Sequence, residues 1–139
     1  MKKNHRFLPY GALAMLAAIL VLSSCEPLEI PVITDPHVTE SSPAVISATA
    51  IMKSKQIDEC GVIFSSKTSS PTLSKNDGIV YGTLDGNGSF SATVPVEANV
   101  TYYFVFFATN EIGTTTSESL KLTTNPLSPK QEDNPLPKP

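Results

Sequence analysis

Apolar and polar residues alternate with a period of two along two stretches of the chain. From Ala44 to Met52 every even position is apolar, whereas the odd positions include Ser47 and Thr49. This period is that of a β-strand with one buried face. A second stretch, residues 88–96, repeats it, and its expected inward residues are Phe90, Ala92, Val94 and Val96. We therefore predict two half-buried strands whose even-numbered residues face the core.

Four further segments favour strands, and turn signals separate them. The β-rich runs are Asp58 to Ser65, Gly78 to Thr83, Thr101 to Thr109 and Thr114 to Thr124. Residues that tolerate a positive φ stand between the runs at 76–78, 85–88 and 110–113, as tight hairpins require. No segment after residue 24 shows helical spacing over ten or more residues. The pattern predicts an all-β fold, an immunoglobulin-like Greek-key sandwich of about seven strands.

The segment from Thr101 to Thr109 (TYYFVFFAT) is the most strongly β-prone of these. Its expected inward series is Tyr102, Phe104, Phe106 and Ala108, and its outward series is Tyr103, Val105 and Phe107. Val96 lies six residues before Tyr102, a spacing that resembles a tyrosine corner, in which the hydroxyl bonds to backbone just upstream. An outward aromatic stripe can form an exposed apolar patch, so Tyr103, Val105 and Phe107 are candidate contact residues. The alternative is that another part of the chain covers them.

Three segments are similar to motifs of one family. VEANVTYY, from Val96 to Tyr103, resembles the L-x-P-N-T-T-Y-Y of fibronectin type III-like domains, which are common in surface lipoproteins of the Bacteroidetes. ATNEIGT (108–114) is similar to the family's A-T-N-x-x-G-T, and ECGVIFS (59–65) to its E-x-G-V-x-Y-S. Ala98, Val100 and Val105 depart from the family pattern. The resemblance covers about residues 31–124 and implies a sandwich in which Val96, Tyr102, Asn110 and Gly113 have structural roles.

The first 24 residues have the pattern of a secretory signal. Three positive charges within the first six residues precede an apolar run of sixteen, residues 7–22, which is too short for a stable membrane-spanning helix. The run ends in Leu22-Ser23-Ser24-Cys25, which resembles the lipobox of bacterial lipoproteins. That resemblance implies cleavage before Cys25 and lipidation of its thiol. An ordinary signal peptide with a Cys25–Cys60 disulfide is the alternative.

These features divide the chain into four parts. We expect a lipoprotein signal peptide at 1–24, an acidic, proline-containing tether at 25–30, the sandwich at 31–124 and a disordered proline-rich tail at 125–139. Two or three acyl chains on Cys25 would attach the protein almost permanently to a membrane. We therefore expect a lipid-anchored, extracytoplasmic protein at the outer membrane or cell surface.

Charge and composition argue against several functions. After residue 24 the chain has seven lysines, no arginine and thirteen acidic residues, which excludes the basic surface of a nucleic-acid binder. His37 is the only histidine there, so no catalytic triad can be built and we expect no enzyme and no cofactor. Asp35, His37 and Glu40 lie on an extended edge, where a solvated surface is favoured over a metal site. The Asp85 loop lacks the glycine and glutamate that a calcium loop needs, so a hairpin turn is favoured.

These observations favour binding as the role of the protein. We expect a non-catalytic module that contacts an envelope protein or a glycan, anchored to the membrane through the lipid on Cys25. A structural spacer or accessory subunit of an outer-membrane assembly is the first alternative, and a cryptic hydrolase is a remote one. Cys60, the only other thiol, is expected to be a small buried apolar residue in preference to a reactive group.

Overall fold

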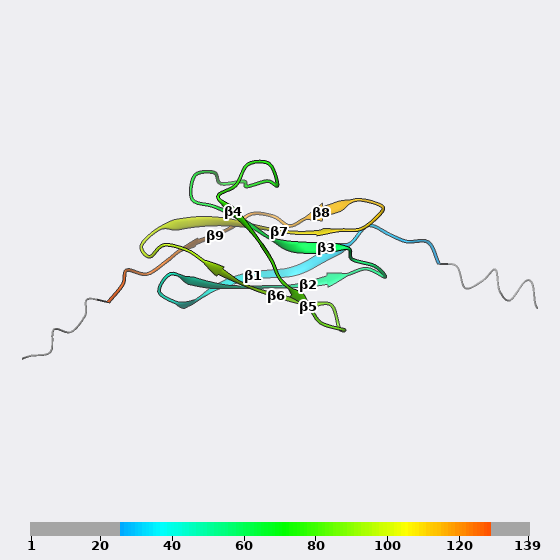
Figure 1. Cartoon of the computed structure of the whole chain (residues 1–139), viewed down its shortest axis with the longest axis horizontal. Coiled ribbons are helices and arrows are strands. Elements are labelled where there is room, and N and C mark those ends of the chain that lie inside the picture. The colour runs from blue at the N-terminus through cyan, green and yellow to red at the C-terminus, as the bar shows by residue number, and fades with distance from the viewer. Residues whose placement is uncertain (1–25, 129–139) are drawn as a thin grey trace, which may run out of the picture.

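A computed structural model of the protein describes residues 26–128, which form two antiparallel β-sheets packed face to face (Figure 1). The first sheet has the spatial order β1 (Val32–Ser42), β2 (Val45–Lys53), β6 (Ser89–Pro95) and β5 (Thr83–Leu84). The second has the order β4 (Gly78–Tyr81), β3 (Glu59–Ser65), β7 (Thr101–Thr109) and β8 (Thr114–Thr116), and β9 (Leu120–Thr123) also pairs with β7. The all-β prediction is confirmed for this part of the chain. The predicted signal peptide, Cys25 and residues 129–139 lie outside it.

The alternation read from the sequence places the core between the sheets. Four even-numbered residues of β2 are at most 4% exposed: Ile46, Ala48, Ala50 and Met52. On β6, Phe90 and Val94 are buried, and Ala92 packs against the same cluster. Ala44 is different because it lies in the turn before β2, with a φ of 65°. The predicted inward faces of these two strands are confirmed.

Strand β7 forms the middle of the second sheet. From Tyr103 to Thr109 it pairs with the whole of β3, and on its other side it pairs with β8 and β9. Its inward residues are buried as predicted: Tyr102, Phe104, Phe106 and Ala108. The rings of Phe106 and Phe90 meet edge to face across the two sheets, with centroids 5.8 Å apart. Aromatic burial of this kind supplies a large part of the apolar area that a small sandwich needs.

Two predicted strands are each divided in the structure. The run 78–83 begins in the second sheet as β4 and continues in the first sheet as β5, and the chain crosses between the sheets at Gly82. A Cβ on Gly82 would overlap the Phe90 ring and the Ser91 carbonyl oxygen, so the crossing needs a glycine. The run 114–124 is interrupted at Ser117, whose hydroxyl accepts the Phe106 N–H at 3.0 Å in place of a backbone carbonyl.

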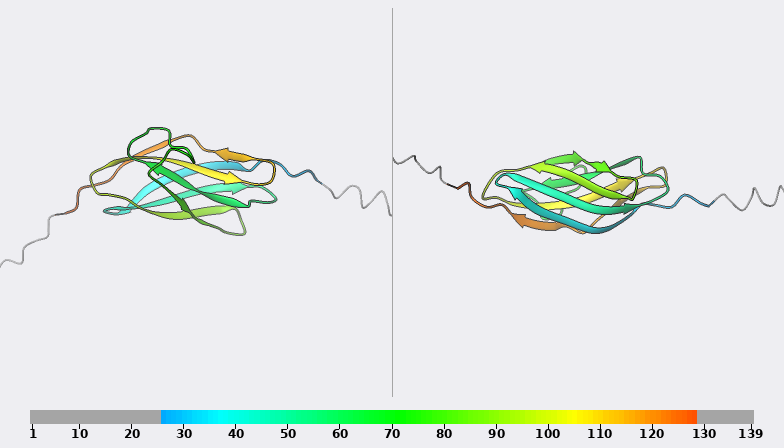
Figure 2. Two further views of the ribbon diagram at one scale, coloured as in Figure 1. Left: turned by 45° about the horizontal axis from the view of Figure 1, so that its top comes forward. Right: turned by 90° about the horizontal axis from the view of Figure 1, so that it is seen from below.

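The chain enters and leaves the sandwich at opposite ends (Figures 1 and 2). Glu26 to Pro31 approaches beside the β2–β3 and β7–β8 connections. Asn125 to Ser128 leaves beside the β1–β2 turn and the β6–β7 loop. The long axis of the domain therefore separates the two segments.

Candidate functional site

The predicted contact stripe lies on the outer face of the second sheet, but most of it is not exposed. Val105 is 6% exposed, Phe107 is 0% exposed, and only Tyr103 is half-buried. All three side chains point away from the core, as the alternation predicted. The expectation of an open apolar patch is wrong at Val105 and Phe107, because two other parts of the chain cover them.

Tyr81 and Gly61 enclose Phe107. The Tyr81 ring stands edge-on to the Phe107 ring, with centroids 6.0 Å apart and planes at 83°. Gly61 lies opposite Phe107 in the β3–β7 ladder, and a Cβ on Gly61 would come within 2.7 Å of the Phe107 ring. Tyr81 itself remains 58% exposed, so it shields Phe107 and meets solvent with its other face.

The connection between β3 and β4, residues 66–77, covers Val105. Pro71 is buried, and it lines a shallow groove of about 500 Å³ together with Val105 and the neighbouring Ile63, which is 0% exposed. The Ser119 hydroxyl donates to the Ser69 carbonyl at 2.6 Å and fixes the connection to the β8–β9 interruption. The outer face of this sheet thus has a small apolar cluster of its own. We call residues 66–77 the cover loop.

Asp77 closes the base of the cover loop. Its carboxylate accepts the backbone N–H of Ser66 at 2.7 Å and the Ser66 hydroxyl at 2.8 Å. The backbone hydrogen bond from Ser66 is the main reason that the pKa of Asp77 is lowered, and the charge of Lys67 contributes less. At the tip, backbone N–H groups and carbonyls are exchanged between Thr72 and Lys75, as in a small hairpin. The loop is therefore held at its base, along its side and at its tip.

The tyrosine corner is confirmed. Tyr102 is 6% exposed, and its hydroxyl oxygen accepts the backbone N–H of Glu97 at 3.1 Å. Val96 packs against the core beside it. This bond satisfies a backbone donor in the β6–β7 loop, where no ladder partner is present.

Asn110 connects three separate segments. Its side-chain N–H groups donate to the carbonyl of Glu29 at 2.6 Å and to that of Gln56 at 3.4 Å, and its carbonyl oxygen accepts the N–H groups of Ile112 and Gly113. The residue is 4% exposed. Sequence reasoning placed Asn110 and Gly113 in a turn. It did not find that Asn110 holds the incoming tether, because that contact spans 81 residues.

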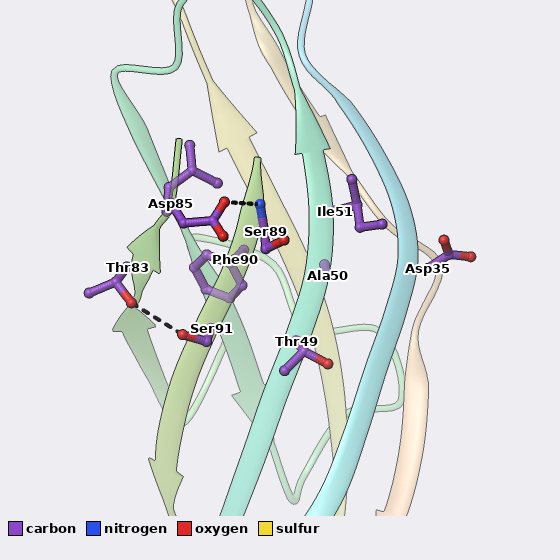
Figure 3. A pocket seen from close by; sticks show the side chains of 10 residues that line it. Asp35, Thr49, Ala50, Ile51, Thr83, Asp85, Ser89, Phe90 and Ser91 are labelled. Atoms are coloured by element: carbon purple, nitrogen blue, oxygen red, sulfur yellow. Dashed lines mark hydrogen bonds between the residues drawn. The ribbon is translucent and has the colours of Figure 1, made fainter. Parts of the chain in front are cut away.

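A shallow groove of about 610 Å³ lies on the outer face of the first sheet (Figure 3). Figure 3 shows Thr83 and Ser91, whose hydroxyls lie 3.2 Å apart, and Asp85, whose carboxylate accepts the Ser89 N–H at 2.8 Å. Asp85 also accepts the Asn87 N–H at 2.9 Å, so its oxygens serve the β5–β6 turn. No basic group lines this groove, which provides no acid–base pair for proton transfer.

The residues considered for a metal site are not brought together. Asp35 lies in a β-bulge of β1 with a φ of 49°. Glu40 is engaged elsewhere, since its carboxylate accepts the backbone and side-chain N–H groups of Asn125 at 2.6–3.1 Å. Between residues 26 and 128, no three His, Cys, Asp or Glu side chains are close enough to hold a metal ion.

Cys60 lies half-buried at the start of β3 and packs against the core. Burial raises the pKa of its thiol, and the neighbouring Glu59 charge raises it further. A raised pKa keeps the thiol protonated at neutral pH, which disfavours nucleophilic chemistry.

Comparison of the chain with protein-family models, curated proteins and solved structures gives no match. The functional argument therefore depends on the geometry of the described residues. Between residues 26 and 128 no helix is present that is long and apolar enough to cross a membrane. Cys25, the predicted lipidation site, lies outside these residues.

Proposed function

We propose that the protein is a lipid-anchored spacer of the cell envelope. In this proposal Cys25 carries the lipid, and the sandwich holds the chain after Asn125 at a distance from the membrane. The observation that carries the proposal is that the chain enters and leaves at opposite ends and is fastened at both. Asn110 holds Glu29 at the entry, and Glu40 holds Asn125 at the exit. A domain fastened in this way transmits a defined separation between its ends.

We also propose that the sandwich is fibronectin type III-like and belongs to a surface lipoprotein of the outer membrane. The order β1-β2-β6-β5 facing β4-β3-β7-β8 supports the first part, because Greek-key connections place strands that are distant in sequence side by side in each sheet. The bond between Tyr102 and Glu97 supports it independently. The second part is supported by the leader and by Leu22-Ser23-Ser24-Cys25.

The spacer proposal includes the absence of catalysis. His37, the only imidazole after the leader, is exposed on the edge strand β1. Asp85 and Glu40, two of the three carboxylates weighed as metal ligands, are bonded to backbone N–H groups. A hydrolase would need convergent, uncommitted polar groups in a recess.

Contact with an envelope protein or a glycan is the second candidate, and the cover loop favours it. Leu73, at the loop tip, is 48% exposed although the rest of the loop is held in place. A fixed loop that presents an apolar side chain is suited to a partner. Loss of co-purifying envelope material in Leu73→Ser, with the fold retained, would support this candidate over a pure spacer.

The anchor is tested by intact mass of the protein purified from membranes. The expected mass is that of a chain beginning at Cys25 with two or three acyl chains, and Cys25→Ser should leave an unprocessed precursor. An unmodified Cys25, or a Cys25–Cys60 disulfide, would contradict the proposal.

The spacer role is tested by energy transfer to a membrane dye. In a Cys60→Ser background, a fluorophore is attached to Glu111→Cys at the entry end or to Ser128→Cys at the exit end. The lipidated protein is then placed in vesicles that contain an acceptor lipid. We expect strong transfer from position 111 and weak transfer from position 128. Equal transfer from both positions would mean that the domain lies flat on the membrane and does not hold its exit end away from it.

A further inference from the structure

Exposed aliphatic side chains gather at the end of the sandwich where the tether enters. Ile30, Val32 and Ile112 are 48%, 52% and 54% exposed, and they are three of the seven large apolar residues exposed between positions 26 and 128. Ile30 and Val32 line one groove of about 450 Å³ beside the tether. The Ile30 side chain lies 3.8 Å from the Cβ position of Gly113, which follows Ile112 in the β7–β8 turn. We call these three residues the end patch.

The tether is fastened to this end of the domain. The Glu29 carbonyl accepts the Asn110 side chain at 2.6 Å and the Ser54 hydroxyl at 3.4 Å. Glu26 forms an ion pair with Lys55 at 2.5 Å. The segment between Glu26 and Ile30 therefore follows the body of the domain.

This attachment limits how far the end patch can be from Cys25. Four residue steps separate Cys25 from Glu29, and an extended chain spans at most about 3.6 Å per residue, so the two are no more than about 14 Å apart. The polar headgroup region of one leaflet is several ångströms thick. A lipid on Cys25 therefore brings the end patch to the surface of its own membrane.

We infer that the end patch rests in the interfacial region of the bilayer that holds the Cys25 lipid, so that the domain stands with its long axis away from the membrane. This inference rests on the proposed lipid anchor. Because the lipid supplies the attachment, the patch contributes orientation, through a contact made at high effective concentration. Three aliphatic side chains without a basic cluster suit such an auxiliary contact.

The charges at this end select the type of lipid. Glu26, Glu29, Lys53 and Lys55 line the groove beside the patch, Glu111 precedes Ile112, and because Glu26 is paired with Lys55 the negative charges are in excess by one. Anionic headgroups would be repelled over a distance of about 8–10 Å at physiological ionic strength. The surface that fits is therefore zwitterionic, such as phosphatidylcholine or phosphatidylethanolamine.

The chain contains no tryptophan, so a single tryptophan can report on this contact. Ile112→Trp places it in the end patch. Leu127→Trp is the matched control, because Leu127 is also an exposed aliphatic residue, at 66%, and lies at the exit end. The lipidated full chain is placed in phosphatidylcholine vesicles with and without brominated acyl chains. We expect at least twofold greater quenching at position 112 than at position 127. Quenching at 112 no greater than at 127 would overturn the inference.

Two further measurements distinguish a contact made by the end patch from closeness to the membrane that the lipid alone would cause. Ile30→Ser with Val32→Ser, added to Ile112→Trp, should reduce the quenching at least twofold while the far-UV circular dichroism is unchanged. Unreduced quenching would contradict a role for the patch. Replacing a third of the lipid with phosphatidylglycerol at low salt should also reduce the quenching, and an increase would contradict the choice of a zwitterionic surface. The intact mass of each sample shows separately whether the lipid is present. Absence of the lipid anchor can therefore be distinguished from absence of contact between the end patch and the bilayer.

Discussion

The outer faces of the two sheets differ in the polarity and the exposure of their side chains. On the first sheet the outward residues of β2 and β6 are mostly small and hydroxylated, such as Thr49, Ser89 and Ser91, and they meet solvent directly. On the second sheet the outward residues at the centre of β3 and β7 are apolar. Ile63, Val105 and Phe107 are each at most 6% exposed, because the cover loop and Tyr81 lie over them. Apolar residues at outward positions thus indicate a third layer, which can be supplied by the same chain.

The difference also explains why the second face carries a long connection. The cover loop, Ser66 to Asp77, contains no run of apolar residues and has the sequence of an ordinary loop. It nevertheless places Pro71 on the sheet and is bonded at Ser69 and Asp77. A connection with these internal bonds behaves as a small structural unit. The predictions below test how far this layer shares the stability of the true core.

The largest expected effect is at the two phenylalanines on opposite faces of β7. Phe104→Ala should lower the free energy of unfolding by about 3–5 kcal/mol through lost burial and a residual cavity. Phe107→Ala should cost nearly as much, about 3 kcal/mol, because it is equally buried. Ser91→Ala, on the solvent-exposed outer face of the first sheet, is the control, and it should change the free energy of unfolding by less than about 0.5 kcal/mol. Urea denaturation measures all three, and a near-neutral Phe107→Ala would mean that the cover layer opens freely.

A glycine substitution tests how tightly Phe107 is enclosed. Gly61→Ala would place a methyl group 2.7 Å from the Phe107 ring and 2.8 Å from the Val80 carbonyl oxygen. The overpacking should cost about 1–3 kcal/mol. Gly86→Ala, with nothing within 4 Å of its Cβ position, should be almost neutral. Thermal unfolding of the two variants compares them, and equal melting temperatures would refute the close packing.

The two tyrosines separate a buried hydroxyl from an exposed one. Tyr102→Phe removes the acceptor of the Glu97 N–H and should cost about 1 kcal/mol. Tyr81→Phe retains the ring that shields Phe107 and should change stability by less than about 0.5 kcal/mol. Chemical denaturation resolves this difference. A larger loss of stability in Tyr81→Phe than in Tyr102→Phe would mean that the Tyr81 hydroxyl makes a polar contact that the structure does not show.

The smallest expected effect is an acid opening of the cover loop. The pKa of Asp77 is lowered in the folded state, so the bonds to Ser66 stabilise the loop above the ordinary aspartate pKa of about 3.9. That stabilisation is lost as the pH falls below this value and through the lower folded pKa. Hydrogen exchange of the Ser66 amide should therefore accelerate, relative to its intrinsic rate, as the pH falls below about 4. In Asp77→Asn this acceleration should be absent, and its persistence would identify another group as the cause.

The sequence predicted the side-chain orientations well because period two is a local property of strands. The inward faces of β2, β6 and β7 and the tyrosine corner at Tyr102 depended on residues within a few positions of one another. The burial of Val105 and Phe107 could not be predicted in the same way, because it depends on where residues 66–77 and Tyr81 fold back. The alternation shows which side a residue faces and not what lies beyond it.

The same distinction applies to the ends of the domain. Asn110 was recognisable as a turn residue, but its bond to Glu29 joins positions 81 residues apart. The division of the final strand at Ser117 depends on a hydroxyl that replaces a backbone acceptor for Phe106. Serine in a Thr-rich strand gives no signal of this, because both residue types are common on exposed edges.

The placement of the two ends also determines how the domain responds to force. If the membrane holds Glu26 and a load acts on the chain beyond Asn125, the pull runs along β1 and β9, in opposite directions. Each strand would have to slide past its neighbour, so all the hydrogen bonds between β1 and β2, and between β9 and β7, would resist together. The side-chain bonds from Asn110 to Glu29 and from Asn125 to Glu40 lie at the two points where the load enters. A pull along the long axis would thus load the domain in shear, and the hydrogen bonds of each strand pair would have to break together and not one after another.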